Sequence, residues 1–343
     1  MSRSKVIAPI ILPYGGILPT FASPPACGQG SAVLGRATVG ARAIFGAAAV
    51  VRADGNVVTV GDDFCLGPRS TVHIATDTYP TIIGDRVSVG MGSLIHACRV
   101  GNDVVLGDGV VLLDGCEVGD NVLIEDGSVV FPRARLDTGG VWAGCPAKRV
   151  RDVSPGELAT SAERLRGRAL ATILETGEGG DVPGCLFVAP NVLLRGDVTA
   201  AGDASIWFGA ELDARGHAIR LGARCNVQDN SRIVCTSGPV LIGADTVLGH
   251  NVTLESCTVG TRCLIGNGAV VHEGTTIADD VLLAAGAWTE PGQVLAGGSL
   301  WAGRPARPRF DLSQDRRAEI ADIVRGYVAY ARDYVRQHPE LAV

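Results

Sequence analysis

An apolar residue returns every six positions through the middle of the chain, and a glycine follows several of these residues. In the first half this ladder comprises Ile83, Val89, Ile95, Val100, Leu106, Leu112, Val118, Ile124 and Val130, with a single five-residue step after Ile95. A period of six fits neither an α-helix nor a long flat strand, but it is the length of one side of a prism-shaped solenoid. We therefore predict parallel β-helices with three short strands per coil. The apolar residues point inward, and the glycines permit the backbone conformations that turn the corners.

The ladder returns in the second half of the chain. Its members there are Ile242, Leu248, Leu254, Val259, Ile265, Val271, Ile277 and Leu283. Each lies 159 positions after its counterpart, as 242 − 83 shows for the first pair. Further upstream the offset is 161, as 221 − 60 shows for Leu221 and Val60, so the length changes between Val72 and Ile83. An internal duplication is the simplest account.

A helix is predicted after each copy of the ladder. The first starts at Ser154-Pro155-Gly156-Glu157, where Ser154 is the N-cap and Glu157 completes a capping box, and it ends at Gly177–Gly180. Its apolar face comprises Leu158, Leu165, Ala169 and Ile173. The second starts at Ser313 and presents Ile320, Val324, Tyr327, Ala331 and Tyr334, with the tyrosines packing rather than binding a ligand. The predicted fold is all-β: two tandem left-handed parallel β-helices, each followed by an α-helix, in domains spanning 1–176 and 181–343.

Composition excludes several classes of function. The net charge of −6 and the lack of a long basic run argue against a nucleic-acid partner. No apolar run is long enough to span a bilayer, so no membrane association is expected. The ten cysteines include no CxxC pair, and several stand at apolar ladder positions. They are interpreted as reduced core residues of a cytoplasmic protein.

Several stretches go beyond the bare repeat. They are SIWFGAEL (205–212), NVQD (226–229), PTIIGDRVSVG (80–90), SLWAGRPAR (299–307) and VWAGCPAKRVRDVSPGE (141–157). In these stretches the chain resembles the γ-class carbonic anhydrases, over roughly residues 10–158 and 182–335. The resemblance implies trimers with a zinc-like metal held by three histidines at each interface between β-helices. The first and third histidines come from one β-helix and the second from its neighbour.

The histidine ligands are divided between the two copies. The first copy has His73 and His96 at the first and third ligand positions, with Met91 at the second. The second copy has Val234 and Glu255 at the first and third positions, with His250 at the second. Neither copy can supply the family's three ligands, but an N-terminal domain beside a C-terminal domain can.

The pairs that support the family's site are divided along the same line. The first copy keeps Arg52 and Asp54 but has Gly67-Pro68 in place of Gln-Asp. The second copy keeps Gln228-Asp229 but has Asp213 and Arg215 in place of Arg-x-Asp. By resemblance, Arg52, Asp54, Gln228 and Asp229 orient the ligands or hold the interface, and Gln228 also directs the reactive water.

Three neutral imidazoles leave an open position on Zn²⁺, Fe²⁺ or Co²⁺ that can hold water. Such water ionises at a pKa of about 7, and the resulting metal-bound hydroxide can add to CO₂ or a small carbonyl substrate. The sequence therefore predicts a metal-dependent lyase or hydrolase with a small-molecule substrate, assembled as a homo-oligomer through its β-helix faces. Stacked rings of like domains would remove the mixed site, so the stoichiometry decides whether it forms.

Other interpretations remain open at this point. The histidines could be relics in a non-catalytic assembly subunit. The same β-helix also serves hexapeptide-repeat acyltransferases, which use a histidine as general base, and acyl-CoA thioesterase chemistry is a further alternative. A second metal site built from Cys235, Glu255 and His250 is also conceivable. No role is predicted for His217, His272 and His338, because a lone histidine on a β-helix is usually solvated or hydrogen-bonded.

Overall fold

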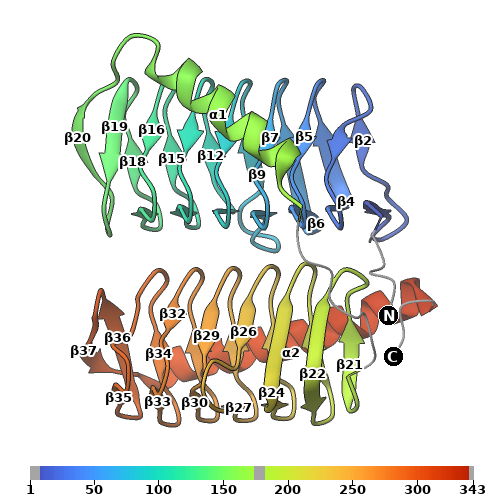
Figure 1. Cartoon of the computed structure of the whole chain (residues 1–343), viewed down its shortest axis with the longest axis vertical. Helices are drawn as coiled ribbons and strands as arrows, with labels where there is room; N and C mark the ends of the chain where they lie inside the picture. Colours follow the sequence, from blue (N-terminus) through green and yellow to red (C-terminus); the bar gives the residue numbers. More distant parts are fainter. Residues whose placement is uncertain (1–7, 174–181, 340–343) are drawn as a thin grey trace. The chain divides into compact units, whose positions relative to one another are not determined.

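The computed structural model describes residues 8–173 and 182–339, which divide into two compact units. We call residues 8–173 the first unit and residues 182–339 the second unit. Each is a left-handed β-solenoid followed by one helix (Figure 1), which confirms the predicted fold. The expected boundary between domains at 176–181 and the helix stop at Gly177–Gly180 lie outside the described residues.

The strands of the first unit form two sheets. The 12-stranded sheet contains β1 (Ile10–Leu12), β2 (Thr20–Phe21), β4 (Ala32–Val39), β6 (Val50–Val60), β8 (Thr71–His73), β9 (Thr81–Ile83), β11 (Leu94–His96), β12 (Arg99–Val100), β14 (Val111–Leu112), β15 (Glu117–Val118), β17 (Val129–Val130) and β18 (Arg135–Leu136). The eight-stranded sheet contains β3 (Ala26–Cys27), β5 (Ile44–Phe45), β7 (Cys65–Leu66), β10 (Ser88–Val89), β13 (Val105–Leu106), β16 (Leu123–Ile124), β19 (Gly140–Ala143) and β20 (Lys148–Asp152). The long strand β6 pairs with both β8 and β9, so the larger sheet covers two faces of the prism.

The second unit repeats this arrangement. Its eight-stranded sheet contains β21 (Cys185–Val188), β23 (Ala204–Ile206), β25 (Asn226–Val227), β28 (Val247–Leu248), β31 (Leu264–Ile265), β34 (Leu282–Leu283), β36 (Ser299–Gly303) and β37 (Ala306–Asp311). Its nine-stranded sheet contains β22 (Leu193–Ala200), β24 (Glu211–Leu221), β26 (Arg232–Val234), β27 (Val240–Ile242), β29 (Thr253–Glu255), β30 (Thr258–Val259), β32 (Val270–Val271), β33 (Thr276–Ile277) and β35 (Val294–Leu295). Here β24 takes the place of β6 and pairs with both β26 and β27.

The hexapeptide ladder sets the register of the coils. Ile83 pairs with Val100, Val89 with Leu106 and Ile95 with Leu112, each one coil apart. These side chains are buried in one apolar core that runs along the axis of the first unit. The five-residue step after Ile95 is absorbed at a corner, so the residues of successive coils still stack. The inward orientation predicted from the period of six is therefore confirmed.

The glycines that follow the ladder residues have a different role from the one predicted. A Cβ atom on Gly90 would lie 2.5 Å from the backbone of Gly107 on the next coil. The left-handed backbone falls two positions after such glycines instead, at residues such as Arg86 (φ 56°) and Asp103 (φ 55°). Glycine is therefore required for close approach between coils, not for its φ angle. Asp108 Oδ1 also accepts a hydrogen bond from the Met91 amide at 2.7 Å, which ties the same two coils together.

Helix α1 (Glu157–Ala171) packs on the eight-stranded sheet of the first unit. Leu165 and Ala169 are buried as predicted, and Ala169 contacts Ile44 and Cys65. Two details differ from the prediction. The helix starts after Gly156, so Ser154 is not its cap, although its amide donates to the Glu157 carboxylate at 2.9 Å. Ile173 lies beyond the helix and is 86% exposed, because the helical turns end at Ala171.

Helix α2 (Gln314–Gln337) starts at Ser313, whose hydroxyl accepts from the Arg316 amide at 3.2 Å, as predicted. Its apolar face packs on aromatic residues of the second unit. The ring of Tyr334 lies 5.4 Å from Trp207 and 5.4 Å from Phe187 between centroids. The packing role predicted for the tyrosines is confirmed.

All ten cysteines are free thiols, and Cys98, Cys257 and Cys263 are buried at ladder-associated positions as expected. Burial raises the pKa of Cys257 to about 12 and that of Cys65 to about 11. These thiols therefore stay protonated in the folded protein. No helix among the described residues combines the length and apolar character needed to cross a membrane.

We expect Gly90→Ala to destabilise the protein by about 1–3 kcal/mol, because the new methyl group must displace backbone of the next coil. The matched control is Gly167→Ala within α1, where an added Cβ atom meets nothing within 4 Å. That control should be neutral or stabilising by up to about 1 kcal/mol. Urea denaturation followed by circular dichroism measures both variants, and equal effects would contradict the close-approach role.

We also expect the folded protein to lose stability as pH rises above the ordinary thiol value of 9.0. Above pH 9.0 the thiols of the unfolded chain ionise, while the buried thiols of the folded protein hold their protons. The stability that the buried thiols contribute is therefore fully present below pH 9.0 and is lost toward about pH 11–12. Urea midpoints at about pH 8 and pH 10.5 measure this loss. The Cys257→Ala variant should lose less than the wild type over the same interval, and an identical loss would refute the assignment.

Candidate metal centre

Two histidines of the first unit face each other across neighbouring coils. His73 ends β8 and His96 ends β11, and the two residues are partners in register. Nδ1 of His73 lies 3.2 Å from Nε2 of His96, and the ring centroids are 5.2 Å apart. The stacking of the coils thus brings together two side chains that are 23 positions apart in the sequence.

The second nitrogen of each ring faces a carboxylate. His73 Nε2 lies 3.3 Å from Asp54 Oδ1, and His96 Nδ1 lies 2.6 Å from Asp114 Oδ1. Arg52 in turn donates from Nη1 to Asp54 Oδ2 at 2.6 Å. Each imidazole thus has a carboxylate at one nitrogen and faces the other imidazole with its second nitrogen. Metal-bound histidines commonly have a carboxylate at the nitrogen that does not bind the metal.

The carboxylates on either side are ionised. Burial would raise the pKa of Asp54, but Arg52 and His73 outweigh it and hold that pKa well below its usual range. Burial would also raise the pKa of Asp114, but the hydrogen bond with His96 and its charge outweigh burial, and the pKa of Asp114 is lowered. An ionised carboxylate accepts the N–H of the imidazole beside it. The two nitrogens that face each other then present lone pairs, and a shared cation stabilises that arrangement.

The spacing of the two nitrogens fits a divalent metal. Two imidazole nitrogens at 2.0–2.1 Å from a tetrahedral Zn²⁺ would be separated by about 3.3 Å. The separation of 3.2 Å between His73 and His96 is close to that value. The donor set of neutral imidazoles suits Zn²⁺, Fe²⁺ and Co²⁺. His73 and His96 can therefore serve as two ligands of one ion.

The third predicted ligand, His250, lies in the second unit just after β28. Its Nδ1 atom is 3.1 Å from Asp229 Oδ2, while Asp229 Oδ1 accepts from the Phe208 amide at 3.0 Å. Gln228 donates from Nε2 to Asn226 Oδ1 at 3.2 Å, which fixes the plane of its amide. Asp229 of the retained Gln-Asp pair therefore faces its histidine, as Asp54 and Asp114 face the histidines of the first unit.

At the positions equivalent to the histidine pair, the second unit has no imidazole. Val234 and Glu255 are partners in register there, one coil apart, just as His73 and His96 are. Asp213 forms ion pairs with Arg215 at 3.2 Å and Arg195 at 3.3 Å instead of supporting a histidine. A network of ion pairs thus occupies the face on which the first unit carries its histidines.

The alternative site built on Cys235 is not favoured. Its thiol donates to the backbone oxygen of Ala218 at 3.7 Å, and burial raises its pKa. A protonated thiol engaged with a carbonyl is a poor metal ligand, because the thiolate is the form that binds.

The predicted residues therefore fall into two sets, each assembled within its own unit. The first unit brings together His73, His96, Arg52 and Asp54, and the second brings together His250, Gln228 and Asp229. Sequence reasoning missed Asp114, the closest carboxylate to the pair. Asp114 stands 18 positions, or one coil, after His96, and that spacing was the only signal, because no motif contains it.

Family models recognise the repeat itself. The bacterial transferase hexapeptide (six repeats) model matches residues 97–132, and the hexapeptide repeat of succinyl-transferase matches residues 57–97, 239–273 and 257–288. A crystal structure from Desulfovibrio desulfuricans G20, described as an acetyltransferase, is similar in fold. It has 12% sequence identity and a TM-score of 0.55, covering 95% of this chain and 82% of the other.

Two relatives of the chain are named as carbonic anhydrases, one of them as a gamma carbonic anhydrase. Gamma carbonic anhydrase 1, mitochondrial, of Arabidopsis thaliana is 33% identical over 159 residues, which is 44% of this chain and 58% of the plant protein. The carbonic anhydrase of Geobacillus kaustophilus is 30% identical over 159 residues, covering 46% of this chain and 87% of the bacterial protein. The chain belongs to the γ-class carbonic anhydrase family.

We expect Asp114→Asn to weaken metal binding by the first unit about 10–100-fold, because His96 loses the ionised acceptor that fixes its ring and raises its basicity. Zinc titration of the metal-stripped protein against a competing chelator measures the affinity. Asp137→Asn, an exposed carboxylate of the same unit, is the matched control. Equal affinities for the two variants would remove Asp114 from the centre.

Proposed function

We propose that this chain is a metal-dependent lyase or hydrolase of the carbonic anhydrase type. Its single kind of site takes His73 and His96 from an N-terminal domain and His250 from a C-terminal domain. The observation that carries the proposal is the complementary retention of ligands: each copy keeps what the other has lost. The close pairing of His73 with His96, each backed by a carboxylate, supports it.

A bound metal would supply an activated water for addition to CO₂ or another small carbonyl compound. The protein's own residues do the positioning. Asp54 and Asp114 hold the two rings of the first unit, and Arg52 keeps Asp54 ionised. Asp229 holds His250, and Gln228 offers an amide oxygen to orient water once its nitrogen has bonded to Asn226.

The names of the relatives favour CO₂ as the substrate. Each domain has kept only half of the supporting residues, so a modified substrate preference is part of the proposal. We further propose that the chain acts in the cytoplasm as a homo-oligomer, in which N-terminal and C-terminal domains of the same or different chains share the site.

The test is the metal content of the purified protein, measured by mass spectrometry. We expect about one metal per chain in the wild type, and its loss in His73→Ala, His96→Ala and His250→Ala alike, since each removes one of three ligands. His217→Ala is the matched control, because His217 is exposed in the second unit and should leave the metal in place. Hydration of CO₂ by the loaded protein, followed in a stopped-flow pH assay, should be lost in the same three variants.

Two results would overturn this proposal. Metal retained by His250→Ala would show that the site belongs to the first domain alone. A wild type that takes up no metal would favour the assembly-subunit interpretation, in which the histidines are relics.

A further inference from the structure

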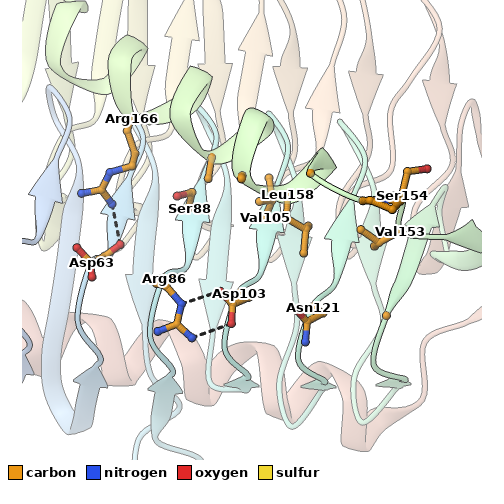
Figure 2. A pocket seen from close by; sticks show the side chains of 15 residues that line it. Asp63, Arg86, Ser88, Asp103, Val105, Asn121, Val153, Ser154, Leu158 and Arg166 are labelled. Atoms are coloured by element: carbon orange, nitrogen blue, oxygen red, sulfur yellow. Dashed lines mark hydrogen bonds and ion pairs between the residues drawn. The ribbon is translucent and has the colours of Figure 1, made fainter.

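The first unit has a groove whose lining residues are not among the predicted site residues. It is a groove of about 720 Å³ between α1 and the eight-stranded sheet. Figure 2 shows Arg166 at one end and Ser154 at the other, with Leu158 and Val105 between them. His73 and His96 belong to strands of the other sheet, so the groove is not part of the metal centre. Its size lies within the range of natural small-molecule sites, about 300–1,000 Å³.

The second unit has an ion pair at the place equivalent to this groove. At the offset of 159, the groove residues Asn121, Gly139 and Leu158 correspond to Asp280, Gly298 and Arg317. In the second unit, Arg317 lies 3.0 Å from Asp280 and donates to the backbone oxygen of Gly298 at 3.5 Å. These contacts tie the start of α2 to the solenoid. Leucine and asparagine cannot form that ion pair, and in the first unit the space between them is open.

The arginines around the groove differ in the groups that they contact. Asp103 is held by both nitrogens of the Arg86 fork, and Asp63 by Arg42 in the same way. Arg166 instead donates to the backbone oxygen of Asp63 at 2.7 Å (Figure 2) and to that of Arg42 at 3.4 Å. Within the described part of the chain, Arg166 forms no ion pair with a carboxylate. The guanidinium of Arg166 is therefore a cation of the groove that no carboxylate contacts directly, although the nearby Asp63 carboxylate attracts it.

We propose that this groove binds an aliphatic carboxylate. The anion lies at Arg166, whose guanidinium matches the geometry of a carboxylate, and the hydrocarbon body lies along Val105, Leu158 and Ala162. The helical distance from Leu158 to Arg166 is about 12 Å, which suits an elongated molecule rather than a compact one. A phosphate ion alone would meet the charge but would leave the apolar wall unused.

Calorimetric titration of the full chain tests the proposal, with sodium decanoate as the probe below its micelle concentration. We expect saturable binding of decanoate, and no binding of decylammonium or of inorganic phosphate. Arg166→Gln should raise the Kd for decanoate at least tenfold, whereas Arg164→Gln should leave it unchanged. Arg164 is the matched control because it is an exposed arginine on the same helix outside the groove.

A second variant copies the ion pair of the other unit. The double substitution Leu158→Arg with Asn121→Asp introduces the Arg317–Asp280 ion pair into the first unit, and it should abolish decanoate binding while circular dichroism and the melting temperature stay near those of the wild type. Failure of the wild type to bind decanoate, equal binding of decylammonium, or unaltered binding by the folded double variant would each overturn the proposal. His73→Ala should bind decanoate normally, so this result is independent of the metal centre.

Discussion

The structure depends on the in-register stacking of one coil on the next. Each ladder residue packs on its equivalent one coil away, and the backbone hydrogen bonds run between the same coils. Parallel neighbours in such a stack are about 4.8 Å apart. At a corner this spacing leaves no room for a side chain, which is why a Cβ atom on Gly90 would collide with the backbone beyond it. The aspartate or asparagine that follows such a glycine uses the same proximity, because its side chain accepts from an amide of the adjoining coil.

The candidate metal centre is a result of this stacking. Histidines in matching positions of successive coils face each other at the distance that two ligands of one ion require. The surrounding carboxylates also come from adjoining coils, Asp54 from β6 and Asp114 from the turn after β14. In the second unit, the same matching positions hold Val234 and Glu255. The scaffold is thus conserved between the copies, while a few positions at the ends of matching strands differ in whether they carry an imidazole.

Much of the fold could be predicted from the sequence, because a period of six and a constant offset specify which residues stack. The register of Ile95 on Leu112 follows from that pattern, and the buried face of α2 follows from the helical spacing of its apolar residues. The details at corners and helix ends could not be predicted. They depend on three-dimensional crowding, as at Gly90, or on the point where a helix meets the solenoid, as at Gly156. The pair of histidines was predicted through the family resemblance. Asp114 belongs to no motif, so its contact with His96 could be identified only from the three-dimensional structure.

The segment after β8 is longer than its counterpart after β26. Seven residues separate His73 from Thr81, but five separate Val234 from Val240, and the offset between the copies changes from 161 to 159 in this segment. The coils on both sides are nevertheless superposable in register. A two-residue insertion within a face would displace every later residue relative to the corners, whereas an insertion at a corner leaves all later coils unchanged. The one change of offset between the two ladders therefore falls in a turn, the turn that follows His73.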